Sequence, residues 1–199
     1  MPSRKARVSP QLNTKGITML LEGELVAILR AADELIMAGG RTLLSRVLKG
    51  SRERKVLELK LDSCPSYGYY RELNYPDIMK RIDWAIVKGY LAIDYLGRLP
   101  VLTFTSAGWE IEQNTYSDEL LKKLREIANG PVQMADVEFL RDKNRSLIFM
   151  LLDKIEAAKD NRLLSVLEEW RKTDYKKVRT RISEIMQSLE SRKEDIQRS

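Results

Sequence analysis

The sequence predicts a mainly α-helical fold with one small β-hairpin, followed by a helical C-terminal region. Apolar residues recur at helical spacing through most of the 199 residues. Two short apolar segments flank Gly97, a pattern typical of a β-hairpin. Proline and glycine disappear beyond Pro131, where helical spacing alone remains. Hydrophobic residues make up 43% of the chain, which is enough for a folded core.

The N-terminal half contains four helices, the hairpin and one more short helix. Gly50 and Gly89 each end an apolar stripe, as glycine commonly does at a helix C-terminus. Ser51 is placed to cap the third helix, and Pro76 suits the first position of the fourth. We therefore expect helices over 24–37, 43–48, 52–61 and 76–88, strands over 90–95 and 101–105, and a short helix containing Trp109.

The order of these elements, helices followed directly by a hairpin, is typical of a winged helix, with the hairpin as the wing. Beyond it we expect helices over 117–128 and 132–140 and around the apolar runs 147–155, 163–170 and 175–189. The expected organisation is a basic flexible segment over 1–23, a winged-helix domain over 24–115 and a helical region over 116–199. The last region offers a surface for a partner protein or for a dimer.

Several classes of chemistry are excluded by composition. The chain has no histidine and a single cysteine, Cys64, so histidine-dependent triads, histidine zinc sites and an intrachain disulfide cannot form. Neither the phosphate-binding pattern G-x-x-x-x-G-K-[ST] nor the dinucleotide-binding pattern G-x-G-x-x-G occurs. We expect no catalytic residue, no metal and no cofactor, and hence a protein that is not an enzyme.

Charge and hydropathy indicate the setting in which the chain acts. The formal net charge is +6 and the pI is about 9.3, which favours a polyanionic partner. No stretch approaches the roughly 20 apolar residues of a membrane span, and the polar start lacks the apolar run of a signal peptide. We expect a soluble, cytoplasmic protein without membrane contact.

The strongest local signal is a basic run over 40–55, in which Glu53 is the one acid. It surrounds a turn between two helices, where free backbone amides, a hydroxyl and cations can together hold phosphate. Gly50 lets the backbone approach closely. A solvated basic helix face is the alternative. The candidate phosphate-binding residues are Lys49, Gly50, Ser51, Arg52, Arg54 and Lys55.

Two further surfaces are candidates for nucleic-acid contact. With the isoleucines of the fourth helix turned inward, Lys80, Arg81 and Lys88 fall partly or wholly on its outer side. Trp84 on the same helix is favoured as a core residue over a stacking residue. The wing tip carries Tyr95, Leu96, Arg98 and Leu99, which can wedge between bases or pack on the C-terminal helices.

A third basic cluster lies between the last helices, and a solvated helix face is the favoured interpretation of it. Its members are Arg171, Lys172, Lys176, Lys177, Arg179 and Arg181.

Over about 24–115 the sequence resembles the RQC domain, the winged helix found C-terminal to the motor of RecQ helicases. Four ordered landmarks carry the resemblance: the K-G-S turn at 49–51, the Tyr67-Gly68 pair, the G-Y-L run ending at Leu91, and L-T-x-T-x-x-G ending at Gly108. The resemblance implies binding to duplex ends, forks or G-quadruplexes. No motor, zinc-binding region or HRDC domain is recognisable, so we expect a free-standing protein of this type.

The resemblance also implies roles for particular residues. In the family the K-G-S-like turn and the helix after it hold backbone phosphates, which carries over to Lys49, Ser51 and Lys55 with Arg52 and Arg54 as neighbours. In some members an aromatic wing tip separates terminal base pairs. Here the tip carries Leu96, Arg98 and Leu99, with Tyr95 nearby, so the sequence departs from that pattern.

The leading hypothesis is a structure-sensitive, sequence-independent DNA-binding protein that acts in repair or replication beside a separate helicase. A dimeric winged-helix transcription regulator is the first alternative. An adaptor that binds a protein through its C-terminal helices is the second. The preferred DNA structure, the choice between DNA and RNA, and the oligomeric state stay open at this point.

Overall fold

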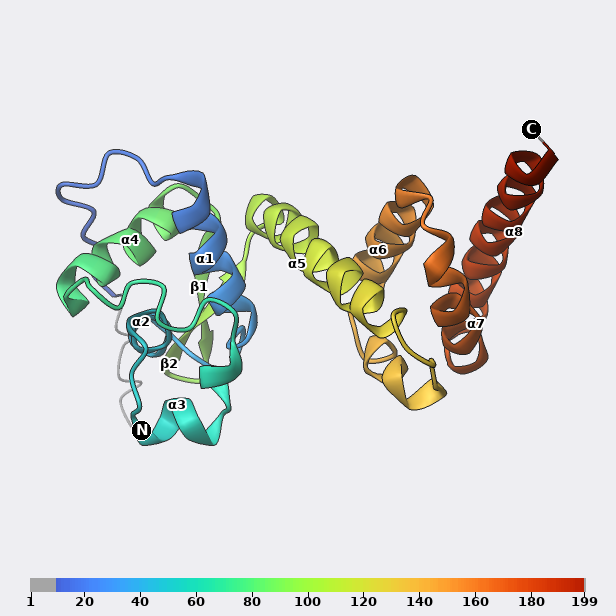
Figure 1. Cartoon of the computed structure of the whole chain (residues 1–199). Helices are drawn as coiled ribbons and strands as arrows, with labels where there is room; N and C mark the ends of the chain where they lie inside the picture. Colours follow the sequence, from blue (N-terminus) through green and yellow to red (C-terminus); the bar gives the residue numbers. More distant parts are fainter. Residues whose placement is uncertain (1–9, 199) are drawn as a thin grey trace. The chain divides into compact units, whose positions relative to one another are not determined.

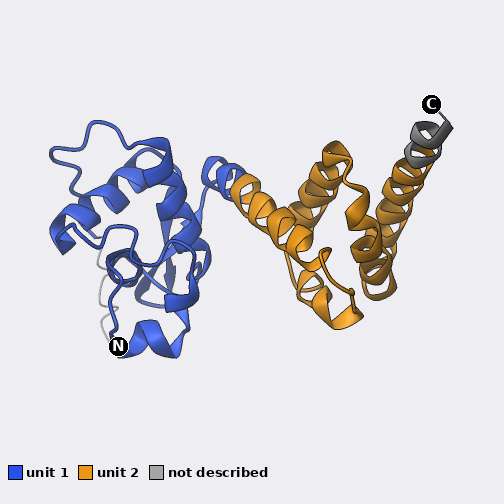
Figure 2. Ribbon diagram, viewed as in Figure 1, with its two compact units in different colours: residues 1–112 blue, residues 113–199 orange. Residues whose placement is uncertain are grey.

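The computed structural model describes the backbone of residues 10–198 and the side chains of residues 10–191 (Figure 1). It contains two compact units, residues 1–112 and 113–199 (Figure 2). Of the expected flexible segment 1–23, residues 1–9 lie outside the described part. The remainder has no regular structure before Glu22, but it contacts the core: Leu20 is buried and the Asn13 amide donates to the Asp83 carboxylate at 2.8 Å.

The predicted fold class, a mainly helical chain with a small hairpin wing followed by C-terminal helices, is confirmed. The first unit contains the hairpin, in which β1 and β2 pair antiparallel with Leu96 opposite Leu99. Its elements are α1 (Glu22–Asp33), α2 (Arg41–Lys49), α3 (Arg54–Glu58), η1 (Leu61–Ser63), α4 (Tyr75–Val87), β1 (Leu91–Leu96), β2 (Leu99–Phe104) and the start of α5 (Ser106–Ile127).

The core of the first unit lies between α1, α2, α4 and the hairpin. Fully buried aliphatic side chains from each element fill it, including Ile28, Leu44, Ile82 and Leu102. Figure 1 shows the hairpin following α4 directly, so the helix positions the wing. Burial of apolar surface of this kind is the main stabilising contribution to a fold.

The segment between α1 and α2 pairs with the wing, which corrects the expected helix end. The predicted helix over 24–37 ends at Asp33 instead. The Met37 amide donates to the Leu102 carbonyl at 3.0 Å, and the Leu102 amide donates to the Gly39 carbonyl at 2.9 Å. Residues 37–39 are thus tied to β2 by two backbone hydrogen bonds, and Met37 takes a left-handed conformation with φ 59°, which cannot continue the helix.

Other expectations for helices were also wrong. The helix expected over 52–61 is the five-residue α3, because Val56 is the one buried side chain in it and Lys60 takes a left-handed backbone conformation. Glu53 rather than Ser51 is its N-cap. The short helix at Trp109 and the helix over 117–128 are one continuous helix, α5, since no breaking residue separates them.

The second unit is entirely helical. Its core gathers buried residues from every long helix, among them Leu124, Leu151, Trp170 and Ile182. The helix expected over 132–140 is two short 3₁₀ turns. The elements after α5 are η2 (Met134–Asp136), η3 (Glu138–Leu140), α6 (Arg145–Ala158), η4 (Asn161–Leu163), α7 (Leu164–Thr173) and α8 (Lys176–Arg198).

Two features are absent from the part of the chain that the structure describes. Within 10–198, no helix combines the length and apolar character that crossing a bilayer requires. Over the same stretch, no three histidine, cysteine or carboxylate side chains converge as metal ligands would.

Candidate nucleic-acid interface

The turn after α2 is held in one shape by backbone bonds and by a second loop. Gly50 takes φ +76°, and the Ser51 amide donates to the Arg46 carbonyl at 2.9 Å, which closes the helix with a Schellman-type bond. A Cβ at Gly50 would lie 3.1 Å from the Gly68 Cα. The Tyr67 hydroxyl donates to the Ser51 carbonyl at 3.1 Å. Two of the landmarks seen in the sequence, the K-G-S turn and the Tyr67-Gly68 pair, therefore pack directly on each other.

Lys49 has an internal role that the sequence did not indicate. Its Nζ donates to the carbonyl of Leu73 at 2.8 Å and also to the carbonyl of Arg71. In the opposite direction, the amides of Gly68 and Tyr70 donate to carbonyls at the end of α2. The ammonium group of Lys49 thus helps to hold the 68–73 loop on the end of α2, and two of its three protons are used there.

The other cations of the turn face solvent. Arg52 and Lys55 are exposed and have no ionic or hydrogen-bond partner among residues 10–191. Arg54 pairs with Glu58 at 2.6 Å, one turn along α3. Exposed pairs of this kind contribute about 0–1 kcal/mol, so Arg54 can exchange its carboxylate for a phosphate at little cost. We call Gly50, Ser51, Arg52, Arg54 and Lys55 the basic turn face.

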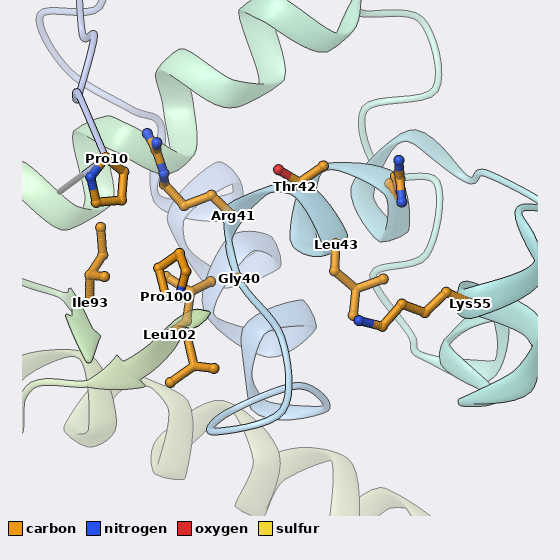
Figure 3. A pocket seen from close by; sticks show the side chains of 11 residues that line it. Pro10, Gly40, Arg41, Thr42, Leu43, Lys55, Ile93, Pro100 and Leu102 are labelled. Atoms are coloured by element: carbon orange, nitrogen blue, oxygen red, sulfur yellow. The ribbon is translucent and has the colours of Figure 1, made fainter. Parts of the chain in front are cut away.

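A pocket of about 250 Å³ lies beside the basic turn face, between the start of α2 and the hairpin (Figure 3). We call it the α2–wing pocket. The carbonyl of Pro100 approaches so closely that a Cβ on Gly40 would lie 2.7 Å from its oxygen. The pocket is lined by Pro10, Gly40, Arg41, Thr42, Leu43, Arg46, Lys55, Ile93, Pro100, Val101 and Leu102.

Two arginines of the pocket have acidic partners. Arg41 pairs with the buried carboxylate of Asp83 on α4 and also donates to the Gln11 carbonyl. Arg46 pairs with Glu53 at 3.0 Å, and both side chains are partly exposed. Both arginines belong to the basic run, but no pattern in the sequence indicates that the hairpin meets them to form a pocket.

The three candidate cations of the fourth helix, Lys80, Arg81 and Lys88, differ in how free they are to contact a phosphate. The Arg81 guanidinium lies 2.9 Å from the Glu24 carboxylate, donates to the Asp77 carbonyl and covers the Tyr70 ring. Lys80 pairs with Asp77 at 2.9 Å and is partly buried. Arg81 was expected partly or wholly on the outer side; its side chain is 21% exposed, and its contacts with Glu24 and Tyr70 hold it against the neighbouring helix.

Lys88 is the α4 cation that faces solvent, 5.9 Å from the centroid of the Trp84 ring. Trp84 itself is 8% exposed, and its indole N–H donates to the Thr18 carbonyl at 3.2 Å. The interpretation of Trp84 as a core residue is therefore confirmed.

The cluster of Glu24, Arg81 and Tyr70 is electrostatically coupled. Burial tends to raise the pKa of the Glu24 carboxyl, but hydrogen bonds from the Leu21 amide, Arg81 and Tyr70 outweigh burial and lower the pKa. Burial and the neighbouring Glu24 carboxylate raise the pKa of the Tyr70 hydroxyl. The cluster joins α1 to α4 and fixes the helix from which the wing extends.

At the wing tip the aliphatic residues are the exposed ones. Gly97, with φ +65°, forms the two-residue turn together with Arg98. Leu96 and Leu99 are 60% and 69% exposed on either side of it. Tyr95 lies further down, opposite Pro100, and is partly buried. The tip thus presents two leucines and an arginine, and no exposed aromatic ring.

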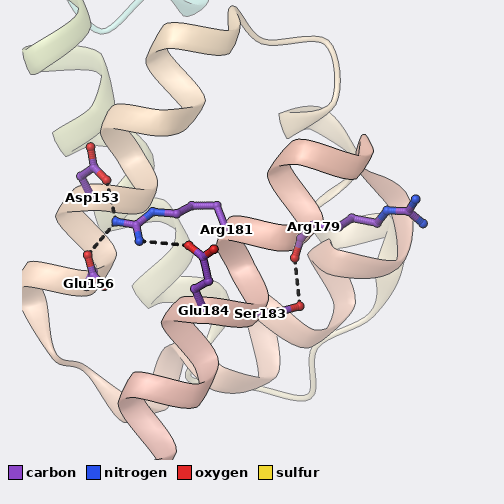
Figure 4. Close-up of polar contacts among 6 residues, drawn as sticks. All are labelled: Asp153, Glu156, Arg179, Arg181, Ser183 and Glu184. Carbon is purple, nitrogen blue, oxygen red and sulfur yellow. Dashed lines mark hydrogen bonds and ion pairs between the residues drawn. The ribbon is translucent and has the colours of Figure 1, made fainter.

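The third basic cluster is split between structural and exposed cations. Arg181 contacts Asp153 at 2.9 Å, Glu156 at 2.7 Å and Glu184 at 3.4 Å, which ties α8 to α6 (Figure 4). Arg179 extends into solvent, and its carbonyl accepts a hydrogen bond from the Ser183 hydroxyl at 3.0 Å (Figure 4).

Comparison with known proteins agrees with the geometry. The family model of the RQC domain matches residues 22–125, just over half of the chain, from the first residue of α1 into α5. The comparisons with curated proteins and with solved structures found no match. The RQC domain is a non-catalytic, DNA-binding winged helix of RecQ helicases, and the family comparison found no motor domain in this chain. The resemblance carried by the four landmarks is thereby confirmed, and the chain belongs to the RQC domain family.

Proposed function

We propose that this protein binds DNA in a structure-sensitive manner, through backbone phosphates, and has no enzymatic activity of its own. The observation that carries the proposal is the basic turn face, where Arg52 and Lys55 are exposed without an acidic partner among the described residues. Residues 24–115 form the DNA-binding part in this proposal. Because these groups contact phosphates rather than base edges, affinity is expected to vary little with sequence.

The basic turn face is suited to phosphate by its chemistry and by its rigidity. The long side chains of Arg52 and Lys55 reach outward, and the Arg54–Glu58 pair can open at little cost. The Ser51 hydroxyl accepts a weak bond from the Glu53 amide at 3.3 Å and keeps its own proton to donate. Packing of Gly50 on Gly68 holds the turn in place, so little order has to be gained on binding.

In this proposal Lys49 supports the turn and adds charge near the phosphate, while two of its three protons stay on the carbonyls of Arg71 and Leu73. Lys88 is a second point of contact at the end of α4, with Lys80 about two turns earlier and Arg81 held by Glu24. The wing tip meets the end of the duplex with Leu96, Arg98 and Leu99. Exposed aliphatic side chains on a hairpin can wedge against a terminal base pair, which would make binding sensitive to ends and forks.

A role in DNA repair or replication beside a separate helicase is part of the proposal, and so is the cytoplasmic location expected from the sequence. The second unit supports a further role as a partner-binding region. It has a hydrophobic core of its own, and most of it lies beyond the residues that the family model matches. Recovery of a motor ATPase by the full chain, and its loss when residues 126–199 are removed, would support the adaptor role.

Fluorescence anisotropy with a blunt duplex, a forked duplex and a single strand tests the proposed function. The variant Arg52→Glu/Lys55→Glu should lose affinity for duplexes of unrelated sequence by the same factor while remaining folded. The matched control, Lys122→Glu/Lys159→Glu, makes the same change in charge at exposed positions of the second unit and should bind as the unsubstituted protein does. Unchanged affinity in a folded Arg52/Lys55 variant would disprove the phosphate site.

A further inference from the structure

We propose that the α2–wing pocket holds one unpaired nucleotide of a DNA strand, with the base against the hairpin and the phosphate toward Arg46 and Lys55. This inference rests on the proposed function and identifies the feature of DNA structure that the protein senses. Three observations carry it: an apolar wall, a cationic wall facing it, and a size that fits one base.

The apolar wall is formed by the hairpin and the segment before α1. Figure 3 shows Pro10, Ile93 and Pro100 on one side of the pocket. Pro100 is exposed and Ile93 is partly exposed, so both offer carbon surface to a ligand. The flat face of a nucleobase can cover such a surface and remove it from water, which is favourable in proportion to the apolar area.

The cationic wall is formed by α2 and α3. Figure 3 shows Lys55 beside Leu43 on the opposite side of the pocket from Pro100. Lys55 has no partner among the described residues, and the partly exposed Arg46–Glu53 pair can open for a phosphate. Arg41 keeps its bonds to Asp83 and to the Gln11 carbonyl, so it contributes positive electrostatic potential to the pocket but no direct bond to the phosphate.

The pairing of these two walls selects the ligand. A free phosphate would leave the apolar wall in contact with water, and a purely apolar ligand would leave Lys55 without a counter-charge. A nucleotide satisfies both walls. Pockets for drug-sized ligands usually have volumes of roughly 300–1,000 Å³. The α2–wing pocket, at about 250 Å³, is smaller, so it fits one base rather than a larger group.

Only an unpaired nucleotide can use the pocket. A base within a duplex is stacked and paired, and turning it out costs a few kcal/mol, whereas a base that is already single-stranded avoids most of that cost. The pocket therefore favours DNA in which single-stranded nucleotides adjoin a duplex, which is the arrangement at a fork or an overhang.

The test compares two duplexes that differ in one group. Each carries a short 3′ overhang, and the first unpaired position holds either thymidine or an abasic sugar. Anisotropy should show about fivefold weaker binding of the abasic duplex, the effect of losing the burial of about 40 Å² of apolar surface. Equal affinities would overturn the pocket proposal and leave phosphate binding intact. Failure to bind either duplex would overturn the proposed function as well.

Two controls sharpen the result. In Thr42→Trp the indole should fill the pocket without changing any charge, since Thr42 lines it from the exposed side of α2. The abasic effect should vanish while affinity for blunt duplex stays within about twofold. Thr180→Trp, the same change on the exposed face of α8, should keep the effect. The comparison in the unsubstituted protein stands even if Thr42→Trp misfolds.

A free mononucleotide separates the two sources of the same chemistry. Thymidine monophosphate should compete far more weakly than the overhang, because it lacks the flanking phosphates that the basic turn face binds. If it competed as well as the overhang strand, the pocket would belong to free nucleotides and the proposal of a DNA strand in it would be overturned.

Discussion

Replacing Lys49 by Met distinguishes a supporting lysine from a phosphate ligand. The substitution keeps most of the side-chain length and removes the ammonium group, so the carbonyls of Arg71 and Leu73 each lose a charge-assisted hydrogen bond. Hydrogen bonds to charged groups contribute about 1.5–3 kcal/mol, and partial exposure places these two toward or below the lower end. We expect a loss of about 2 kcal/mol in the free energy of unfolding.

For a unit of 112 residues, 2 kcal/mol corresponds to a fall of roughly 8 °C in Tm. The matched variant is Lys55→Met, at an exposed position without a partner among the described residues. It should leave Tm unchanged and weaken DNA binding. Scanning calorimetry measures Tm and anisotropy measures DNA affinity for both variants. We expect Lys49→Met to change mainly Tm and Lys55→Met to change mainly affinity.

The opposite pattern in the two variants would contradict a supporting role for Lys49. If Lys49→Met melted within about 1 °C of the unsubstituted protein and lost as much affinity as Lys55→Met, the ammonium group would serve the phosphate and not the 68–73 loop. The internal bonds seen in the free protein would then be exchanged for DNA contacts on binding.

Three further predictions follow from particular contacts. Gly108→Ala should lower the free energy of unfolding by about 3 kcal/mol or more in urea titration, because the new Cβ would lie 1.9 Å from the Tyr90 carbonyl oxygen, although helix propensity alone favours alanine. Because the pKa of Glu24 is lowered in the folded state, its contribution is present above about pH 4.5 and lost as pH falls through the folded pKa, so Glu24→Gln should flatten the stability profile there; an unchanged profile would contradict this. Leu96→Ser/Leu99→Ser should change stability by less than about 0.5 kcal/mol and reduce the preference for forked over blunt duplex in anisotropy; a preserved preference would remove the wing tip from the account.

The helices and the hairpin could be predicted because their signals are local. Apolar spacing marks each long helix, and Gly97 between two apolar segments marks the turn of the wing. The extent of α3 could not be predicted in this way. Its run of Val56, Leu57 and Leu59 has the spacing of a longer helix, but only Val56 finds a core to enter.

The site was predicted less completely because it depends on contacts distant in sequence. The cations of the basic turn face are visible in the run over 40–55. That Lys49 binds the carbonyls of residues 71 and 73 depends on how the following loop folds back. Arg81 likewise has helical spacing that points outward, and only its pairing with Glu24, 57 positions earlier, turns it inward.

The α2–wing pocket shows the same limit. Its walls come from segments that are distant in sequence. They meet where Pro100 closely approaches Gly40, 60 positions earlier. No pattern within either segment indicates that they meet. The one local sign is Gly40 itself, which lies at a helix start where a Cβ is usually tolerated.

The salt dependence of duplex binding tests most directly the central claim that the basic turn face holds DNA phosphates. Each phosphate contact that is lost should reduce the slope of log affinity against log salt by about 0.9 on duplex DNA. The account predicts that Arg52→Gln/Lys55→Gln reduces that slope by about 1.8 relative to the unsubstituted protein, with the same change on duplexes of unrelated sequence. A slope that is unchanged in the folded variant would contradict the claim.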